Sequence, residues 1–259
     1  MEWRNPRARV FPYRRIKRAN AKERSDVTQP SIGILMLKTR FPRVPGDVGN
    51  PETWPFPVLR RVIDAATIDR VVNADPPVDL LLEPFIAGGH ALVEAGAAAI
   101  TTTCGFLALF QDELTRALPV PVLASSLQQA ALVQLSLPHG KRIGIISIHG
   151  GNLSPRHLAA AGVAPDTPVV DTEQGRELSR IILADLEELD MAKAEADILE
   201  AGDALAAQAP DLGAVVLECA NMAPYSKALS WHLGVPVYDI VTMITWFQAG
   251  FAPRVWVHP

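Results

Sequence analysis

The stretch that decides the fold is AAAITTTCGFLALF, residues 97–110. Its first half is small, apolar and uncharged, which is typical of a strand buried on both faces of a parallel sheet. A glycine and an amphipathic run follow, so we expect a helix over 105–118. Cys104 lies where the strand ends and the helix begins. Because open α/β sheets bind ligands at the carboxyl ends of their strands, Cys104 is a candidate site residue.

The second cysteine of the chain, Cys219, stands in the same sequence context. It follows an apolar run in VVLECANMAPY, residues 215–225, and lies 115 residues after Cys104. A Val-Pro-Val triplet recurs at the same offset of 115, at 120–122 and 235–237. Two further apolar runs, around Ile32 and Ile143, are separated by 111 residues. Landmarks that recur at a nearly constant offset indicate an internal duplication.

The pattern along each half predicts alternating strands and helices. We expect strands at 31–37, 97–103, 119–123, 142–148, 213–218 and 235–238, and helices near 57–73, 84–95, 105–118, 154–162 and 174–190, after residue 224, and at 240–249. This alternation predicts an α/β fold of two pseudo-symmetric lobes, each a parallel sheet flanked by helices, with the active site in the cleft between them.

The expected domains follow the duplication. The first lobe covers 31–128, the second covers 129–239, and a C-terminal helix of about 240–259 packs back on the first lobe. Residues 1–30 carry nine Lys or Arg and three Asp or Glu, and we expect a disordered or surface-draped basic extension there.

Composition excludes several classes of function. Outside residues 1–30 the chain has 15 basic and 25 acidic residues, which argues against nucleic acid as a partner. Neither the basic head nor the uncharged stretches 95–111 and 117–138 resembles a signal peptide or a membrane span. Two cysteines suit a reducing compartment, so we expect a cytoplasmic protein without a membrane partner.

Two thiols at equivalent strand ends suggest acid–base chemistry. Each cysteine precedes a predicted helix, whose free N–H groups lower the pKa of a thiol and can bind a carboxylate. If a pseudo-two-fold axis relates the lobes, the thiols of Cys104 and Cys219 face each other across one cleft. One thiolate then takes the α-proton of a small carboxylic acid, and the opposite thiol delivers a proton to the other face.

Polar residues near the same strand ends are candidates for binding the carboxylate. The hydrogen-bond donors among them are Thr103, Ser125, Ser126 and Asn221. The two serines also fit a helix N-cap, an alternative that the sequence leaves open.

Further candidates follow the first strand and precede the second cysteine. Thr39 and Arg40 lie just past the first strand, where Arg40 could pair with a carboxylate or remain a solvated loop charge. If the strand continues through it, Glu218 points away from the site, and we interpret it as a buried structural carboxylate. A role in orienting the Cys219 thiol is the alternative. The histidines show no metal-ligand spacing with either cysteine, so we expect no metal.

These motifs resemble those of the cofactor-independent aspartate/glutamate racemase superfamily, which includes hydantoin racemases, maleate isomerases and arylmalonate decarboxylases. The resemblance covers about residues 31–250 and is carried by AITTTCGFLA (99–108), VVLECANMAPY and the two Val-Pro-Val strands. It implies two pseudo-symmetric lobes, no pyridoxal phosphate, and Cys104 and Cys219 as the acid–base pair. It also implies that the carboxylate is held at the positions after each cysteine, which are Gly105, Phe106, Ala220 and Asn221.

The residues after the cysteines depart from the family pattern. The amino-acid racemases of the family have Asn-Thr after the first cysteine and Thr-His after the second, where this chain has Gly-Phe and Ala-Asn. The amino-group contacts, and with them the substrate, therefore differ.

The first hypothesis is a racemase or epimerase that inverts the centre α to a carboxylate, in an amino acid such as aspartate or glutamate or in a derivative. A maleate-type cis–trans isomerase, with one cysteine adding to the double bond, and a hydantoin racemase remain alternatives. A decarboxylase needs only one proton-donating cysteine, so the second thiol argues against it. A hypothesis of another class is a small-molecule binding protein without turnover. The expected partner is a small-molecule carboxylate, and a homo-oligomer is left open.

Overall fold

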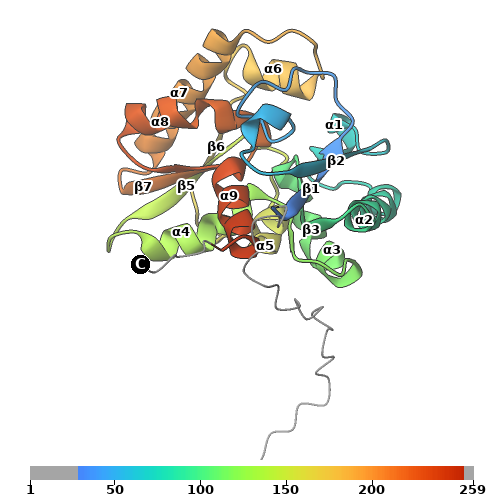
Figure 1. The fold of residues 1–259 in the computed structure, drawn as a ribbon. Helices are drawn as coiled ribbons and strands as arrows, with labels where there is room; N and C mark the ends of the chain where they lie inside the picture. The colour runs from blue at the N-terminus through green and yellow to red at the C-terminus, as the bar shows by residue number, and fades with distance from the viewer. Residues whose placement is uncertain (1–28, 254–259) are drawn as a thin grey trace, which may run out of the picture.

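The computed structural model describes residues 29–253 and contains two parallel four-stranded sheets (Figure 1). The first has the order β2-β1-β3-β4 and the second β6-β5-β7-β8. The strands are β1 (Ser31–Leu37), β2 (Val58–Ile63), β3 (Ala97–Thr102), β4 (Val122–Leu123), β5 (Arg142–Ser147), β6 (Val169–Asp171), β7 (Leu212–Leu217) and β8 (Val237–Tyr238). The predicted α/β fold of two similar lobes is confirmed.

Helices flank both sheets, as Figure 1 shows. The α-helices are α1 (Ile68–Val71), α2 (Val78–Glu94), α3 (Gln111–Ala117), α4 (Ala130–Ser136), α5 (Pro155–Ala160), α6 (Leu178–Leu183), α7 (Met191–Gln208), α8 (Ser226–Leu233) and α9 (Ile240–Phe251). The 3-10 helices are η2 (Pro51–Thr53), η3 (Gly105–Phe110), η4 (Ser126–Gln129) and η5 (Ala220–Tyr225).

The two sheets repeat each other down to an irregularity of register. Between β1 and β3 the pairing shifts after the first residue pair, at Ser31/Ile32. Between β5 and β7 it shifts at the corresponding place, Arg142/Ile143. A shared irregularity at equivalent positions supports the internal duplication.

The last helix belongs to the packing of the first sheet. Asp239 caps α9 by accepting a hydrogen bond from the Thr242 N–H at 2.8 Å. The buried face of α9 then packs on β1 and β3 in one apolar cluster, with members Ile32, Ile34, Ala99, Ile240, Met243 and Ile244. The chain thus returns from the second lobe to cover a face of the first sheet.

Two of the predicted helices are wrong in part. Residues 57–73 form β2 and the short α1, because Val58–Ile63 pairs along the whole length of β1 as an edge strand. Its two arginines are exposed, so the strand lacks the continuous apolar pattern of a buried strand. The helix predicted at 174–190 reduces to α6, which ends before Asp185, a residue with φ of 52°.

The main omission of the sequence analysis is the long helix α7. Its N-cap Asp190 accepts hydrogen bonds from the N–H groups of Ala192 and Lys193 at 3.1 and 3.2 Å. The helix predicted at 84–95 begins earlier, at Val78, and the one predicted at 105–118 divides into η3 and α3. Short β6 was not predicted either.

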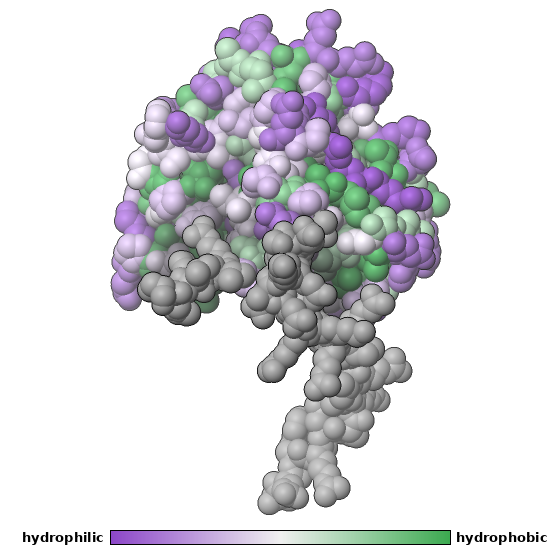
Figure 2. All heavy atoms as spheres, viewed as in Figure 1, coloured by the Kyte–Doolittle hydropathy of each residue, from purple (hydrophilic) through white to green (hydrophobic). Residues whose placement is uncertain are grey.

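Hydrophilic side chains cover much of the surface over α6 and α7. In Figure 2 hydrophilic residues predominate over the top of the molecule, where Figure 1 shows α6 and α7. Within residues 29–253, the helices are too short or too polar to cross a membrane. Apart from its last two residues, the basic extension 1–30 lies outside the described residues.

Replacing Ile244 on α9 with alanine should destabilise the protein by about 2–5 kcal/mol, because a buried side chain is lost and a cavity remains. Ile244 has no exposed surface, whereas Trp246 on the same helix is 63% exposed. Trp246→Ala is the matched control and should change the free energy of unfolding by about 0.5 kcal/mol or less. Urea unfolding of both variants measures the difference. Equal losses would contradict the packing of α9 on the first sheet.

Candidate active site

The two cysteines occupy equivalent places at the carboxyl ends of central strands. Cys104 follows β3 and is the N-cap residue of η3, and Cys219 follows β7 and is the N-cap residue of η5. Both are free thiols, 9% and 6% exposed. The two thiols lie near each other, so negative charge on the Cys104 sulfur raises the pKa of Cys219. The structure therefore brings the predicted pair together.

The ionisation of the thiols differs from the sequence-based expectation. Burial raises the pKa of Cys104, and the nearby charge of Glu218 raises it further. The N–H groups of Phe106 and Leu107 lower it, but by less than burial raises it. The same two causes raise the pKa of Cys219. The expectation of lowered thiol pKa values is wrong because η3 and η5 are short and the sulfur atoms are removed from water.

Glu218 lies between the two halves of the site, and its predicted orientation away from the site is wrong. Its Oε2 accepts hydrogen bonds from the Ser147 hydroxyl at 2.9 Å and the Ile148 N–H at 3.3 Å. Its carboxyl group also abuts Gly105: a Cβ atom there would lie 2.5 Å from the Glu218 main-chain oxygen and even closer to Oε1. Burial raises the pKa of Glu218 to about 7, although hydrogen bonds from the Ile148 N–H, the Ser147 hydroxyl and the Gly105 N–H lower it.

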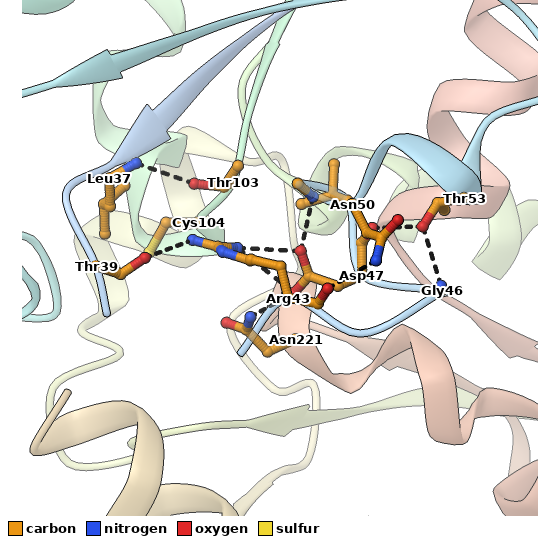
Figure 3. Close-up of polar contacts among 12 residues, drawn as sticks. Leu37, Thr39, Arg43, Gly46, Asp47, Asn50, Thr53, Thr103, Cys104 and Asn221 are labelled. Carbon is orange, nitrogen blue, oxygen red and sulfur yellow. Dashed lines mark hydrogen bonds and ion pairs between the residues drawn. The ribbon is translucent and has the colours of Figure 1, made fainter. Parts of the chain in front are cut away.

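A chain of polar side-chain contacts runs from the Cys219 thiol to Thr39, and Figure 3 shows its part from Asn221 to Thr39. The Cys219 thiol contacts the Asn221 Oδ1 at 3.5 Å. The Asn221 amide donates to Asp47 Oδ2 at 2.5 Å, and the Asp47 carboxylate accepts from Arg43 Nη1 at 3.2 Å. Arg43 Nη2 donates to the Thr39 hydroxyl at 3.0 Å. Residues of both lobes are thereby joined in one polar network.

Arg43 and Asp47 are the site residues that the sequence analysis missed. Figure 3 shows the guanidinium group of Arg43 directed towards Cys104, and its charge lowers the pKa of that thiol. Among the described residues, the buried Nε of Arg43 has no hydrogen-bond partner. The sequence signal that could have identified them is their place in the chain, because both residues follow β1, the strand beside β3.

The loop that carries Arg43 and Asp47 is held by its own hydrogen bonds. The Asn50 amide donates to the Arg43 main-chain oxygen at 2.7 Å, and the Thr53 hydroxyl donates to the Asp47 main-chain oxygen at 2.6 Å. The Gly49 N–H donates to Asp47 Oδ1 at 2.6 Å. These bonds fix the guanidinium and carboxylate groups before any substrate is bound.

Other predicted site residues are committed to structural contacts. Arg40 is exposed and pairs with Asp185 and Glu187, at 3.3 and 3.6 Å, rather than with the Arg43 network. The Thr103 hydroxyl accepts a hydrogen bond from the Leu37 N–H at 3.1 Å.

The two serines after β4 also have defined partners. Ser125 forms a capping box with Gln128 at the start of η4. The Ser126 hydroxyl donates to the main-chain oxygens of Leu217 and Glu218, at 2.7 and 2.9 Å, and so links the lobes. Ser125 therefore has the N-cap role that the sequence left open as an alternative.

The remaining predicted positions line the buried side of the cysteine turns. Phe106 packs edge-on against the His157 ring, with centroids 5.0 Å apart. Ala220 is buried in the cluster formed by α9 and the first sheet. Within residues 29–253, no group of three or more His, Cys, Asp or Glu side chains is arranged to hold a metal ion.

The chain matches a known protein family over most of its length. The sequence model of the family described as Asp/Glu/Hydantoin racemase matches residues 62–247. Curated relatives include a dimethylsulfoniopropionate lyase of Durusdinium sp. clade D, 26% identical over 230 residues, which covers 87% of this chain and 76% of the relative. Dimethylsulfoniopropionate lyase 6 of Emiliania huxleyi is 29% identical over 222 residues, 82% of this chain and 57% of the relative. The chain spans only 47% of lyase 5 from the same species.

Solved structures share the fold at low sequence identity. Arylmalonate decarboxylase matches with a TM-score of 0.58 at 16% identity, over 88% of this chain and 94% of that one. Allantoin racemase from Pseudomonas fluorescens matches with a TM-score of 0.56 at 15% identity, over 86% and 90%. A glutamate racemase isoform from Bacillus anthracis gives 0.54 at 16% identity, over 87% and 84%.

The raised pKa of Glu218 predicts how stability varies with pH. The folded protein keeps the proton on Glu218 up to a pKa of about 7, above the ordinary value of 4.5. The folded state therefore binds more protons than the unfolded state between these values, and the free energy of unfolding falls as pH rises through them. The shift corresponds to a loss of roughly 3 kcal/mol. Glutamine does not titrate, so Glu218→Gln should lack this loss.

Urea unfolding of the wild type and Glu218→Gln between about pH 5 and about pH 8 measures this difference. The stability of the wild type relative to the variant should decrease across the range. A difference that is constant with pH would show that Glu218 titrates alike in the folded and unfolded states.

Proposed function

The chain belongs to the Asp/Glu/hydantoin racemase family, and on this basis we propose that it is a cofactor-independent enzyme that removes a proton from the carbon next to a substrate carboxylate. Cys104 and Cys219 are the acid–base pair. The observation that carries the proposal is the matched placement of two buried thiols at the ends of β3 and β7, one from each lobe. One thiol, as thiolate, takes the α-proton, and the other stands on the opposite side to donate a proton.

The charged groups near the thiols support a carboxylate as the bound end of the substrate. The Arg43 guanidinium faces Cys104, and its Nε is free to donate among the described residues. Arginine binds carboxylates through charge-assisted hydrogen bonds. The Phe106 N–H lowers the pKa of the Cys104 thiol, and it adds a donor where an enolate oxygen would develop charge. Arg43 therefore takes the role that the sequence analysis gave to Arg40.

Two overall reactions follow from the same first step. In a racemase or epimerase, the second thiol returns a proton to the opposite face, so both thiols are required. In a lyase, the electron pair of the broken C–H bond forms a C=C bond while a leaving group departs from the next carbon. The duplication of the thiols favours inversion of an amino acid or a derivative.

The curated relatives favour the second reaction. They are named dimethylsulfoniopropionate lyases, and they match this chain over 82% or more of its length. Applied to this chain, elimination breaks the bond between carbon and the sulfonium sulfur, which leaves with its electron pair as dimethyl sulfide, and acrylate remains. This reaction needs one basic thiol and no proton donor for its neutral leaving group.

Reaction in D₂O followed by proton NMR tests both reactions. The substrates are both enantiomers of aspartate and glutamate, a hydantoin, maleate and dimethylsulfoniopropionate. Because general acid–base groups contribute about 10²–10⁴-fold, Cys104→Ser and Cys219→Ser should each reduce inversion by that factor, while exchange from one face survives in one of them. For elimination, one substitution should abolish product formation and the other should have a much smaller effect.

The outcomes separate the hypotheses. Fumarate formed from maleate would replace both reactions with cis–trans isomerisation. A wild-type protein that binds one of these carboxylates without exchange or product would be a binding protein, and the proposal would fail. Full activity in both cysteine variants would contradict the role of the thiols.

The two arginines of the loop after β1 form a matched pair of variants. Arg43→Met should reduce kcat/KM by about 10–100-fold, the usual cost of losing a hydrogen bond to a charged group. Arg40→Met removes a surface ion pair with Asp185 and should leave kcat/KM within about twofold, because exposed pairs contribute little. Steady-state kinetics on the substrate found above measures both. A larger loss of kcat/KM in Arg40→Met than in Arg43→Met would indicate Arg40 as the carboxylate-binding residue.

A further inference from the structure

Three ionisable groups share one buried space at the junction of the lobes. The Glu218 carboxyl group and both thiols are buried, and the charge of Glu218 acts on each thiol. The Oε2 atom of Glu218 is bound by Ser147 and Ile148. The Oε1 atom is buried against Gly105 and has no side-chain hydrogen-bond partner among the described residues.

The surroundings of Oε1 favour the protonated carboxyl group. A buried carboxylate oxygen that accepts no side-chain hydrogen bond is poorly stabilised when charged. No lysine or arginine is paired with Glu218 within residues 29–253. The charged groups that act on the thiols are Arg43, which lowers the pKa of Cys104, and Asp47, which raises the pKa of Cys219. Arg43 and Asp47 also pair with each other, so they add little net charge.

We propose that Glu218 is a positioning residue that limits the site to one negative charge: a thiol ionises only when the Glu218 carboxyl group holds a proton. When a thiol loses its proton, the S–H electron pair stays on sulfur as thiolate. The neutral form then has its proton on Oε1, the oxygen that accepts no side-chain hydrogen bond, while Oε2 keeps its bonds from Ser147 and Ile148. The ionisation of the thiols does not depend on the reaction, but its use in catalysis rests on the proposed function.

This arrangement gives the thiols an unusual pH dependence. Below a pH of about 7, where Glu218 is protonated, the thiolate population rises about tenfold per pH unit. Above that pH, each further proton is lost from Glu218 instead, and the thiolate population stays level. A thiol without such a neighbour continues to ionise up to its own pKa.

The rate of alkylation by iodoacetamide reports this population, since thiolate is the reactive form. Mass spectrometry of the Cys104 and Cys219 peptides follows each thiol separately, without any substrate. In the wild type the logarithm of the rate should rise with pH and level off near pH 7. In Glu218→Gln it should keep rising, and at about pH 8 the rate should exceed that of the wild type at least threefold.

Ser147→Ala provides a second variant if Glu218→Gln does not fold. Loss of the Ser147 hydrogen bond disfavours the charged carboxylate, so the point where the rate levels off should move to higher pH. Ser179→Ala is the matched control, because its hydroxyl donates to the main-chain oxygen of Ile148 and not to the carboxyl group. Its profile should match that of the wild type.

Three outcomes would overturn the inference. They are a wild-type rate that rises without levelling off, a folded Glu218→Gln that retains the wild-type profile, and a shift in Ser179→Ala as large as that in Ser147→Ala. An alkylation profile as expected, combined with no reaction in D₂O, would support the charge limit and reject the proposed function.

Discussion

The cost of placing charge in a buried space is the constraint on which this site depends. Both thiols and the Glu218 carboxyl group are removed from water, and an unpaired charge in such a place is expensive. The Arg43 guanidinium acts on the Cys104 thiol, and Asp47 already pairs with it. The close approach of Glu218 to Gly105 also explains the glycine, since any side chain there would overlap the carboxyl group. The amino-acid racemases of the family have asparagine at this position. In this chain a glycine replaces it because a larger residue would not fit.

The duplication explains the symmetric part of the site and shows where symmetry ends. By the offsets of 115 and 111 residues, Glu218 corresponds to Thr103, and Ile148 corresponds to Leu37. The Leu37 N–H donates to the Thr103 hydroxyl, and the Ile148 N–H donates to the Glu218 carboxylate. Both lobes therefore use the residue before the cysteine to tie two strand ends together. Only the glutamate has a second oxygen, and that oxygen faces the other lobe.

Much of the fold was predictable because its strands are buried and repeated. The runs around residues 100 and 215 have no charge, and a buried parallel strand leaves that signature in sequence. The edge strand β2 was not recognised, because its exposed arginines remove the signature. The thiol pair was predictable from spacing alone. Arg43 was not separable from Arg40, since only the hydrogen bonds of the folded loop turn one inward and leave the other paired with Asp185. The pKa of each thiol depends on burial and on Glu218, which a local motif does not reveal.

Substrate binding and the protonation of Glu218 are linked in such a site. Under the proposed function, a substrate carboxylate bound by Arg43 adds negative charge near Cys104, because the Arg43 guanidinium acts directly on that thiol. Added negative charge favours the protonated form of a neighbouring carboxyl group. In the proposed charge limit, a thiol ionises only when Glu218 is protonated. The bound substrate carboxylate therefore helps to keep Glu218 in its neutral form. Linkage is reciprocal, so protonation of Glu218 strengthens carboxylate binding by the same factor.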